Sequence, residues 1–252
     1  MRPAPITIVS PLFRTGAYVE ELVNRVDAVM RSRREPWNLL FVDDACPSGS
    51  GRIAARLGHP SVEVAMLAAN VGQQAATTYG VIAAEGGTIV IMDSDLQDRP
   101  EDVPLLLGGV EPGVIVAAGR RGDYTGVAER TTGTAFRLAR WALSRGRVPR
   151  DAGMFVCGEA ATLGSVARSG DPRAHLLSRA ARLDVPVTSI PIERVPRRDG
   201  GSYSSAQRVA MGSRALWTLV SSAAPRRFDW PEVEWLGHDA ARRTAKPREM
   251  EA

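Results

Sequence analysis

The chain has 252 residues, of which 44% are hydrophobic and 24% are charged. This length allows one substantial core, and this composition excludes a collagen-like, disulfide-rich or wholly disordered protein. The formal charge of +4 and the pI near 9.6 come almost wholly from arginine, because Lys246 is the only lysine. No basic helix or platform of basic and aromatic residues is visible, so we expect no nucleic-acid partner.

The two cysteines and the N-terminus indicate the compartment. Cys46 and Cys157 lie far apart without CxxC or Cys/His spacing, which argues against a zinc site and fits a reducing cytosol. The first apolar run is broken at Pro11, too early for a signal peptide, and no stretch reaches the roughly 18 apolar residues of a membrane span. We therefore expect a cytoplasmic protein.

Strands and helices are predicted to alternate along the first hundred residues. Apolar, β-branched runs predict strands at 6–9, 38–42, 62–67 and 88–92. Apolar residues at helical spacing predict helices at 17–33, 52–57, 73–85 and 100–107. This alternation is typical of parallel βαβ units, in which ligands bind beyond the carboxyl ends of the strands.

The second half of the chain continues the α/β pattern less regularly. Further strands are predicted at 114–118, 154–157 and 187–192, with an Ala- and Arg-rich helical segment between the last two. An arginine-rich loop at 119–132 precedes an amphipathic helix at 133–145, and a second amphipathic helix is predicted at 205–224. We expect one domain over 1–224 and a charged, partly disordered tail over 225–252.

Carboxylates stand at the ends of two predicted strands. Asp43 and Asp44 follow one, and the sequence Asp-Ser-Asp-Leu-Gln at 93–97 follows the most hydrophobic one. Two carboxylates two positions apart, with a further oxygen ligand, suit magnesium or manganese, and such an ion can stabilise a departing diphosphate. The alternative is that these acids only cap the next helix.

A series of motifs then resembles a known family. DSDLQDRPED at 93–102 is similar to the Asp-x-Asp-Leu-Gln-Asp-x-Pro-Glu signature of dolichol- and undecaprenyl-phosphate sugar synthases, which are family 2 inverting glycosyltransferases with the GT-A fold. The likeness continues, in order, through FVDDACPSGSG, NVGQQAATTYG, RDAGMFVC and RRDGGSYSS. The resemblance implies a GT-A fold with a mixed, mostly parallel central sheet flanked by helices.

The resemblance also implies roles for single residues. The family's metal ligands correspond to Asp93, Asp95 and Gln97, which would hold Mg²⁺ or Mn²⁺. Its positions near the nucleotide-sugar donor correspond to Pro11, Leu12, Asp43, Asp44, Asn70, Gln73, Asp93, Arg197 and Ser202. For Asp43 and Asp44 the alternative is turn formation, and Asn70 could also serve as a helix cap.

Catalytic roles are expected for Asp95 and for three further residues. Arg120 and Arg130 correspond to the family's mobile loop over phosphate groups, where bidentate arginine would neutralise charge, although each could instead be a solvated surface residue. If the acceptor is a hydroxyl, a carboxylate must remove its proton, and Asp151 is our candidate base. Its alternative is a simple turn residue.

The expected reaction transfers a sugar from a UDP, GDP or dTDP donor with inversion, and a polyprenyl phosphate is the leading acceptor. A soluble hydroxyl acceptor in specialised metabolism is the second hypothesis, and a non-catalytic sugar-nucleotide binder is the third. The 205–224 helix could rest on the inner face of the membrane or pack against the core. Arg14-Thr15 stands where the family usually has Asn-Glu, and the lysine that the family usually has between serine and tyrosine is missing from Ser202-Tyr203, so donor base and acceptor stay open.

Overall fold

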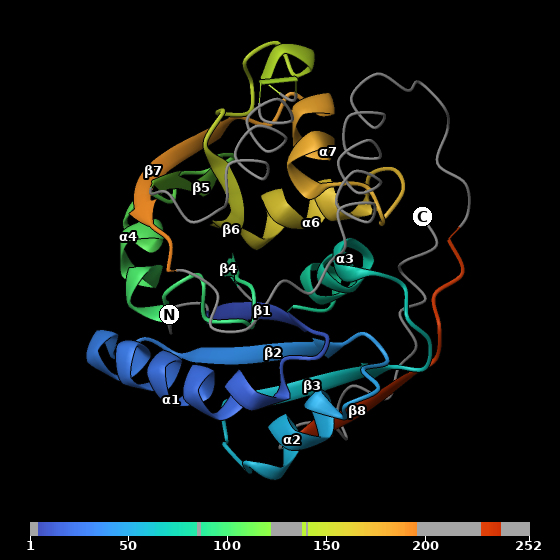
Figure 1. Ribbon diagram of the computed structural model, residues 1–252. Coiled ribbons are helices and arrows are strands. Elements are labelled where there is room, and N and C mark those ends of the chain that lie inside the picture. Colours follow the sequence, from blue (N-terminus) through green and yellow to red (C-terminus); the bar gives the residue numbers. More distant parts are fainter. Residues whose placement is uncertain (1–4, 85–86, 122–137, 140, 196–227, 238–252) are drawn as a thin grey trace.

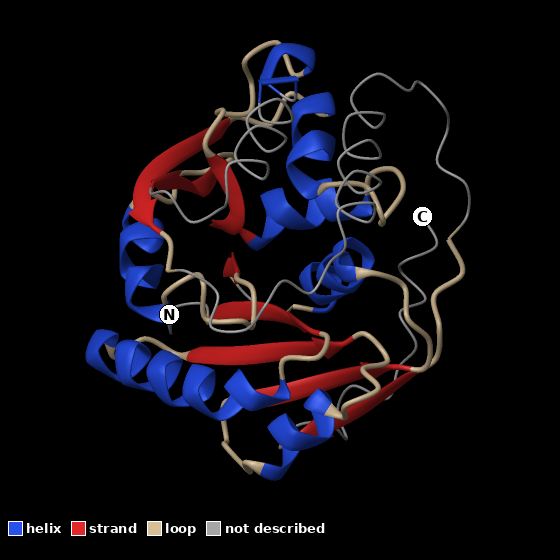
Figure 2. Cartoon of the chain, in the orientation of Figure 1, coloured by secondary structure: helices blue, strands red, loops and turns tan. Residues whose placement is uncertain are grey.

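The computed structural model describes residues 5–84, 87–121, 138–139, 141–195 and 228–237, with only the backbone of Arg120 and Arg121. Figures 1 and 2 show a central sheet with helices on both faces. In chain order the elements are β1 (Ile6–Leu12), α1 (Gly16–Arg33), β2 (Trp37–Asp43), α2 (Ser50–Arg56), β3 (Val62–Leu67), α3 (Gln73–Ala83), β4 (Thr88–Ile91), the 3₁₀ helix η1 (Pro100–Asp102), α4 (Val103–Gly108), β5 (Ile115–Arg121), β6 (Ala152–Glu159), α6 (Ala160–Arg168), α7 (Leu176–Arg182), β7 (Val187–Glu193) and β8 (Val233–Gly237).

The strands of the described residues form one eight-stranded sheet in the order β7-β5-β6-β4-β1-β2-β3-β8. The pairs β1/β2, β1/β4, β2/β3 and β5/β7 are parallel. β6 runs antiparallel to β4 and β5, and β8 runs antiparallel to β3. The predicted α/β class, with a mixed and mostly parallel central sheet, is confirmed.

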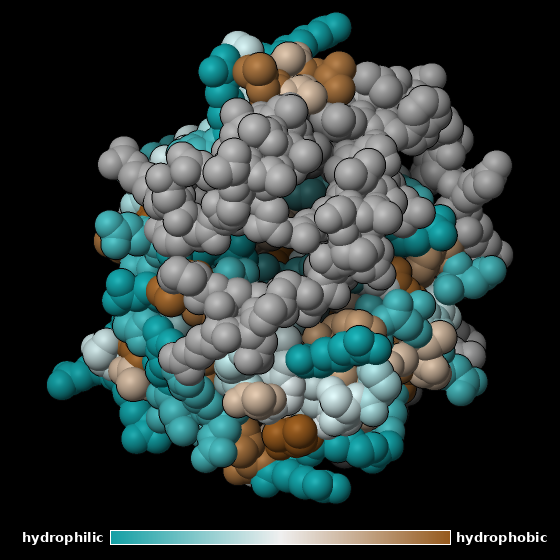
Figure 3. Space-filling view, viewed as in Figure 1, coloured by the Kyte–Doolittle hydropathy of each residue, from teal (hydrophilic) through white to brown (hydrophobic). Residues whose placement is uncertain are grey.

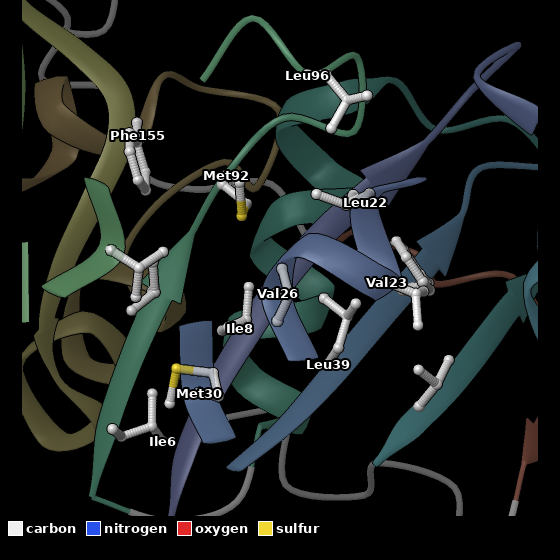
Figure 4. Close-up of a cluster of buried hydrophobic side chains, with 14 of the residues drawn as sticks. Ile6, Ile8, Leu22, Val23, Val26, Met30, Leu39, Met92, Leu96 and Phe155 are labelled. Atoms are coloured by element: carbon white, nitrogen blue, oxygen red, sulfur yellow. The ribbon is translucent and has the colours of Figure 1, made fainter. Parts of the chain in front are cut away.

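Successive residues of the central strands point to opposite faces, and helices cover both. Ile8 of β1 and Leu39 of β2 are fully buried on one face, where they meet Val26 of α1 (Figure 4). Their chain neighbours Val9 and Leu40 are fully buried on the other face, in clusters that include side chains of α3. Burial on both faces explains the largely apolar runs that predicted these strands.

Gly80 lets α3 lie close to the sheet. A Cβ at this position would collide with the Val9 side chain and lie 2.9 Å from Cγ2 of Val42. Overpacking of this kind costs about 1–3 kcal/mol, so Gly80→Ala should lower the free energy of unfolding by that amount. Urea denaturation measures it, with Gly108→Ala as the control because nothing lies within 4 Å of a Cβ there. Equal stability of the two variants would contradict this account of the packing.

β8 was not predicted, and it lies within the segment 225–252 that we expected to be a tail. Trp230 and Trp235 lie against Tyr79 of α3, with ring centroids 5.6 and 6.4 Å apart, so the segment is anchored through aromatic contacts as well as through β3. The available signal was the alternation of Glu232, Val233, Glu234 and Trp235, typical of a half-buried edge strand.

Two predicted helices fall wholly or mainly outside the described residues. The 205–224 helix lies entirely outside them. Of the 133–145 helix, 138–139 and 141–145 are described, and these are helical at 138–139 and 141–143 and form a turn at 144–145. None of the described helices has the length and apolar character that a membrane crossing requires.

Candidate active site

The carboxyl ends of the parallel strands meet at one edge of the sheet. The register pairs Leu12 of β1 with Asp43 of β2, and Val9 of β1 with Ile91 of β4. Asp93 therefore follows β4 at the level where β1 and β2 also end. β6 begins at this same edge, because it runs antiparallel to β4. Most of the predicted site residues are brought to this edge.

The acidic segment after β4 forms a compact turn. Asp93 accepts a hydrogen bond on Oδ1 from Nε2 of Gln73 at 2.7 Å, and Oδ1 of Asp95 accepts one from the backbone N–H of Gln97 at 3.1 Å. Leu96 has a φ of +59° and a buried side chain, so the turn places Asp95 and Gln97 around an inserted apolar residue.

The helix-capping alternative is not what the structure shows at this turn. The next helical residues begin only at Pro100, and the residue at the N-cap position is Arg99, without a side-chain capping bond. Asp93 and Asp95 therefore lie too far ahead of the helix to cap it.

The hydroxyl groups of Ser94 and Thr15 stabilise the turn after β4. Oγ of Ser94 donates to the carbonyl oxygen of Pro11 at 2.8 Å and lies 2.9 Å from Oγ1 of Thr15. Ser94 and Thr15 are both buried. These bonds attach the turn after β4 to the loop after β1, so its geometry is held before any ligand binds.

Arg194, directly after β7, is a site residue that sequence reasoning missed. Its Nη2 lies 3.4 Å from Oδ2 of Asp93, and its Nε lies 3.2 Å from Oδ1 of Asp98. Burial lowers the pKa of Arg194, but the charges of Asp98, Asp93 and Asp95 raise it above its ordinary value. The backbone N–H of Val195 also donates to the carbonyl of Gln97 at 3.0 Å. A basic residue at a strand end was the signal available.

Asp43 shapes the loop after β2. Its carboxylate accepts hydrogen bonds from the backbone N–H of Cys46 at 2.7 Å and of Gly51 at 2.6 Å. Its side chain is almost completely buried. The structure thus gives Asp43 the turn-forming role that was the alternative to donor binding.

Asp44 and Asn70 form a second internal network. The Asp44 carboxylate accepts bonds from the N–H groups of Val71 at 2.6 Å and Gly72 at 2.9 Å, and from Nδ2 of Asn70 at 2.9 Å. Burial raises the pKa of Asp44, as does the charge of Asp43, while the two amide bonds lower it, and the net shift is upward. These contacts set the turn that begins α3 and so place Gln73. A direct contact of Asp44 with the donor stays a prediction.

Pro11 and Leu12 were expected to line the donor pocket. Both are buried at the end of β1, and the Leu12 side chain lies completely within the hydrophobic core. The structure places this side chain in the core at the end of β1, and its role beside the donor stays a prediction. The Pro11 carbonyl oxygen accepts the hydrogen bond from Oγ of Ser94.

Cys46 lies beside these loops in a polar environment. Its Sγ lies 3.0 Å from Oγ of Ser48 and 3.2 Å from Oγ of Ser50, and it accepts a bond from the N–H of Arg14 at 3.0 Å. Burial raises the pKa of the Cys46 thiol, but these hydrogen bonds outweigh burial and lower the pKa to about 7. Cys157 is fully buried, and burial raises its pKa to about 12.

At pH 7, iodoacetamide should therefore modify Cys46, which is 9% exposed, faster than Cys157, which is completely buried, because the thiolate is the nucleophile. The labelling rate of Cys46 should rise with pH to a midpoint near 7, where half the thiol is ionised. Peptide mapping by mass spectrometry at several pH values measures both rates. A midpoint at the ordinary thiol pKa of about 8.5 would show that the hydroxyl and amide contacts do not stabilise the thiolate.

The remaining predicted residues divide into two groups. Asp151 lies just before β6, where its Oδ1 accepts a bond from Oγ of Ser189 at 3.1 Å, and a Cβ at Gly119 would collide with its carboxylate. The backbone of Arg120 continues β5 opposite Ile192 at the same edge of the sheet. The other predicted residues, Arg130, Arg197 and Ser202, lie outside the described residues.

The donor atoms of the turn suit a hard divalent cation. Asp93 and Asp95 offer carboxylate oxygens, and Gln97 offers an amide oxygen. Within the described part of the chain, no cluster of three or more His, Cys, Asp or Glu side chains forms a complete metal cage. Magnesium and manganese sites that use one or two carboxylates take their other ligands from substrate phosphates and water. The set present here fits an ion of that kind.

The fold is shared with solved glycosyltransferase structures. A glucosyl-3-phosphoglycerate synthase from Mycobacterium tuberculosis, in complex with Mn²⁺, UDP and phosphoglyceric acid, aligns over 88% of this chain and 80% of its own, with a TM-score of 0.65 and 18% identity. A mannosyltransferase from Pyrobaculum calidifontis, in complex with GDP-Man and Mn²⁺, aligns over 89% and 67%, with a TM-score of 0.63 and 16% identity. These likenesses show the GT-A fold that the sequence predicted.

Curated relatives resemble the chain in sequence. It is 32% identical over 130 residues to the undecaprenyl-phosphate 4-deoxy-4-formamido-L-arabinose transferase of Pseudomonas fluorescens, which covers 49% of this chain and 38% of the relative. The transferase of the same name from Salmonella paratyphi A is 25% identical over 220 residues, or 81% of this chain and 64% of the relative. The chain spans less than two thirds of the length of either relative.

The family assignment rests on more than half of the chain. Residues 7–165 match the family described as Glycosyl transferase family 2. This range contains β1 except its first residue, β2 to β4, the acidic turn after β4 and the loops that brace it. With its fold and the order of its motifs, the chain belongs to glycosyl transferase family 2.

Proposed function

We propose that this glycosyltransferase moves a sugar from a nucleotide-sugar donor to a polyprenyl phosphate, with Asp93, Asp95 and Gln97 holding Mg²⁺ or Mn²⁺. The observation that carries the donor half is the acidic turn after β4, braced by Ser94 and joined to Gln73. The acceptor half is supported by the relatives in Pseudomonas and Salmonella, whose names state that they act on undecaprenyl phosphate.

The chemistry is a single displacement at the anomeric carbon. A phosphate oxygen of the acceptor bonds to this carbon as its bond to the donor diphosphate breaks, so an α-linked donor gives a β-linked product and a nucleoside diphosphate leaves. A divalent ion at the turn would stabilise the negative charge of the leaving diphosphate. Asp95 would bind this ion, while Gln73 orients Asp93 and Ser94 keeps the turn in place. A phosphate acceptor is already anionic near neutral pH and needs no general base.

An exposed patch next to β6 suits contact with a lipid surface. Leu138, Trp141 and Leu143 are 48%, 36% and 42% exposed, and apolar surface is visible at the top of the molecule in Figure 3. The Arg150 guanidinium lies 4.0 Å above the Trp141 ring, and Arg145 is also exposed. Apolar and aromatic residues beside arginines are typical of surfaces that bind anionic membranes. We propose this patch as the peripheral membrane contact.

The test is a matrix of UDP, GDP and dTDP sugars against undecaprenyl phosphate, 3-phosphoglycerate and water, with Mg²⁺ or Mn²⁺, analysed by mass spectrometry. Undecaprenyl phosphate should gain the mass of one glycosyl unit with one donor class. Glycosylation of the soluble phosphate alone would overturn the lipid acceptor but keep the donor site. Folded protein that consumes no donor would favour the non-catalytic binder predicted as an alternative.

A hydroxyl acceptor remains the second candidate because Asp151 stands at the same edge of the sheet, held by Ser189. As a general base, Asp151 would take the proton of the attacking hydroxyl. Asp151→Asn should then abolish transfer to a hydroxyl acceptor and leave transfer to a phosphate acceptor nearly unchanged. The variant therefore separates the two acceptor classes.

A further inference from the structure

We infer that Arg194 is a built-in counter-ion of the acidic turn, which competes with a divalent cation at Asp93 and makes tight metal binding depend on a nucleoside diphosphate. This inference rests on the metal role proposed above for Asp93, Asp95 and Gln97. It adds a regulatory residue that lies outside the quoted family motifs. It also predicts the order in which the site fills.

Protein donors already occupy both carboxylate oxygens of Asp93. Oδ1 accepts the hydrogen bond from Gln73 at 2.7 Å, and Oδ2 is paired with Nη2 of Arg194 at 3.4 Å. The Arg194 and Asp93 side chains are only 16% and 19% exposed, so water screens this pair weakly. A cation that binds Asp93 must share this carboxylate with a fixed positive charge.

Arg194 contacts two carboxylates, Asp93 and Asp98, and the two contacts differ in length and burial. Nε lies 3.2 Å from Oδ1 of Asp98, whose side chain is 5% exposed, whereas the contact with Asp93 is longer and more open. The backbone bond from Val195 to Gln97 keeps the base of the side chain beside the turn. The guanidinium can therefore release Asp93 and remain attached to Asp98.

A divalent ion arriving alone meets the Arg194 guanidinium beside its ligands, and the two cations repel each other. A nucleoside diphosphate brings negative charge and further oxygen ligands, which offset this repulsion. Metal and nucleotide must then strengthen each other's binding by the same factor, because coupling between two ligands is reciprocal.

The test is Mn²⁺ binding, followed by the EPR signal of the free ion, with and without UDP or GDP. Without nucleotide, Arg194→Gln should bind Mn²⁺ about tenfold more tightly than wild type. A neighbouring positive charge lowers a carboxylate's affinity for a proton by about tenfold or more, and we expect an effect of the same order on a metal cation. Arg194→Lys, which keeps the charge, should bind Mn²⁺ as weakly as wild type. With the better of the two nucleotides present, the difference between wild type and Arg194→Gln should shrink.

Two further variants keep the inference falsifiable if Arg194→Gln does not fold. Asp98→Asn frees the guanidinium to pair with Asp93 alone and should weaken Mn²⁺ binding several-fold. Arg173→Gln removes a surface arginine that pairs with Asp171 and should change nothing. Thermal unfolding of each variant confirms the fold before binding is measured.

The outcomes separate this inference from the proposed function. If wild type binds Mn²⁺ with nucleotide but folded Arg194→Gln binds Mn²⁺ alone no more tightly, Arg194 is structural and the inference is overturned. Unchanged Mn²⁺ binding in Asp98→Asn would also overturn it. If wild type binds no Mn²⁺ even with UDP or GDP, the metal site itself fails, and the inference fails with it.

Discussion

Asp95→Asn should reduce sugar transfer by about 10³-fold, on the order of the several kcal/mol that a metal ion contributes to leaving-group stabilisation. Asparagine keeps an oxygen that can accept the hydrogen bond from the N–H of Gln97, so the turn should keep its shape. What is lost is the negative charge that would hold the cation. Initial rates of nucleoside diphosphate release in the presence of Mn²⁺ measure the effect.

Asp184→Asn is the matched control for this substitution. Asp184 is an exposed aspartate with a φ of +56°, which asparagine tolerates. Its Oδ1 lies 2.8 Å from Nη2 of Arg147 at the surface. Its replacement should leave the rate within about twofold, as expected for a surface change of no more than ±0.5 kcal/mol. A normal rate in folded Asp95→Asn would remove Asp95 from the catalytic machinery.

Asp44→Ala should lower the free energy of unfolding by about 3 kcal/mol, because buried amide donors left unpaired cost roughly 1–3 kcal/mol each. The substitution removes the acceptor for Val71 N–H, Gly72 N–H and Asn70 Nδ2 together. The turn before α3 would lose its internal support. Urea denaturation at pH 7 measures this change in the free energy of unfolding. Nucleotide is left out, so that a contact with the donor cannot contribute.

Two further variants define the source of this effect. Asp44→Asn keeps one acceptor oxygen but points an NH₂ group at the remaining donors, so its loss should be intermediate. Glu234→Ala removes an exposed partner of Arg52 and should cost well under 1 kcal/mol, as surface pairs do. If Asp44→Ala matched Glu234→Ala in stability, the turn would not depend on the buried carboxylate, and Asp44 would be available mainly for the donor.

The central strands were predictable because their burial is dictated locally. A strand covered on both faces is mostly apolar, and β1, β2 and β4 therefore stand out as largely apolar runs before polar turns. The site's position followed from the same pattern, since parallel strands end at one edge. Asp93 and Gln73, twenty residues apart, meet for this reason.

The roles of individual polar residues were harder to predict, because they depend on partners far away in the chain. Arg194 lies about a hundred residues from Asp93, and its own sequence surroundings are only a strand end. Arg179 is 2% exposed and bonded to Thr78 and the carbonyl of Ala167, yet the sequence shows only a helical segment rich in alanine and arginine. Which arginine of such a segment is buried depends on tertiary packing.

Asp43 and Asp44 show a different limit. Their position at a strand end predicted functional carboxylates, and the structure uses both for backbone amides of their own and neighbouring loops. Both uses fit the same sequence, since aspartate is favoured in turns as well as in ligand sites. β8 was missed because a five-residue edge strand with charged neighbours differs little in composition from a tail.

The most direct measurement of divalent-dependent sugar transfer compares the acceptor's mass with nucleoside diphosphate release in one reaction, with Mn²⁺ and after EDTA. We expect equal amounts of glycosylated undecaprenyl phosphate and nucleoside diphosphate with Mn²⁺, and neither after EDTA. Equal product formation in EDTA, with the metal shown to be removed, would contradict the role proposed for Asp93, Asp95 and Gln97.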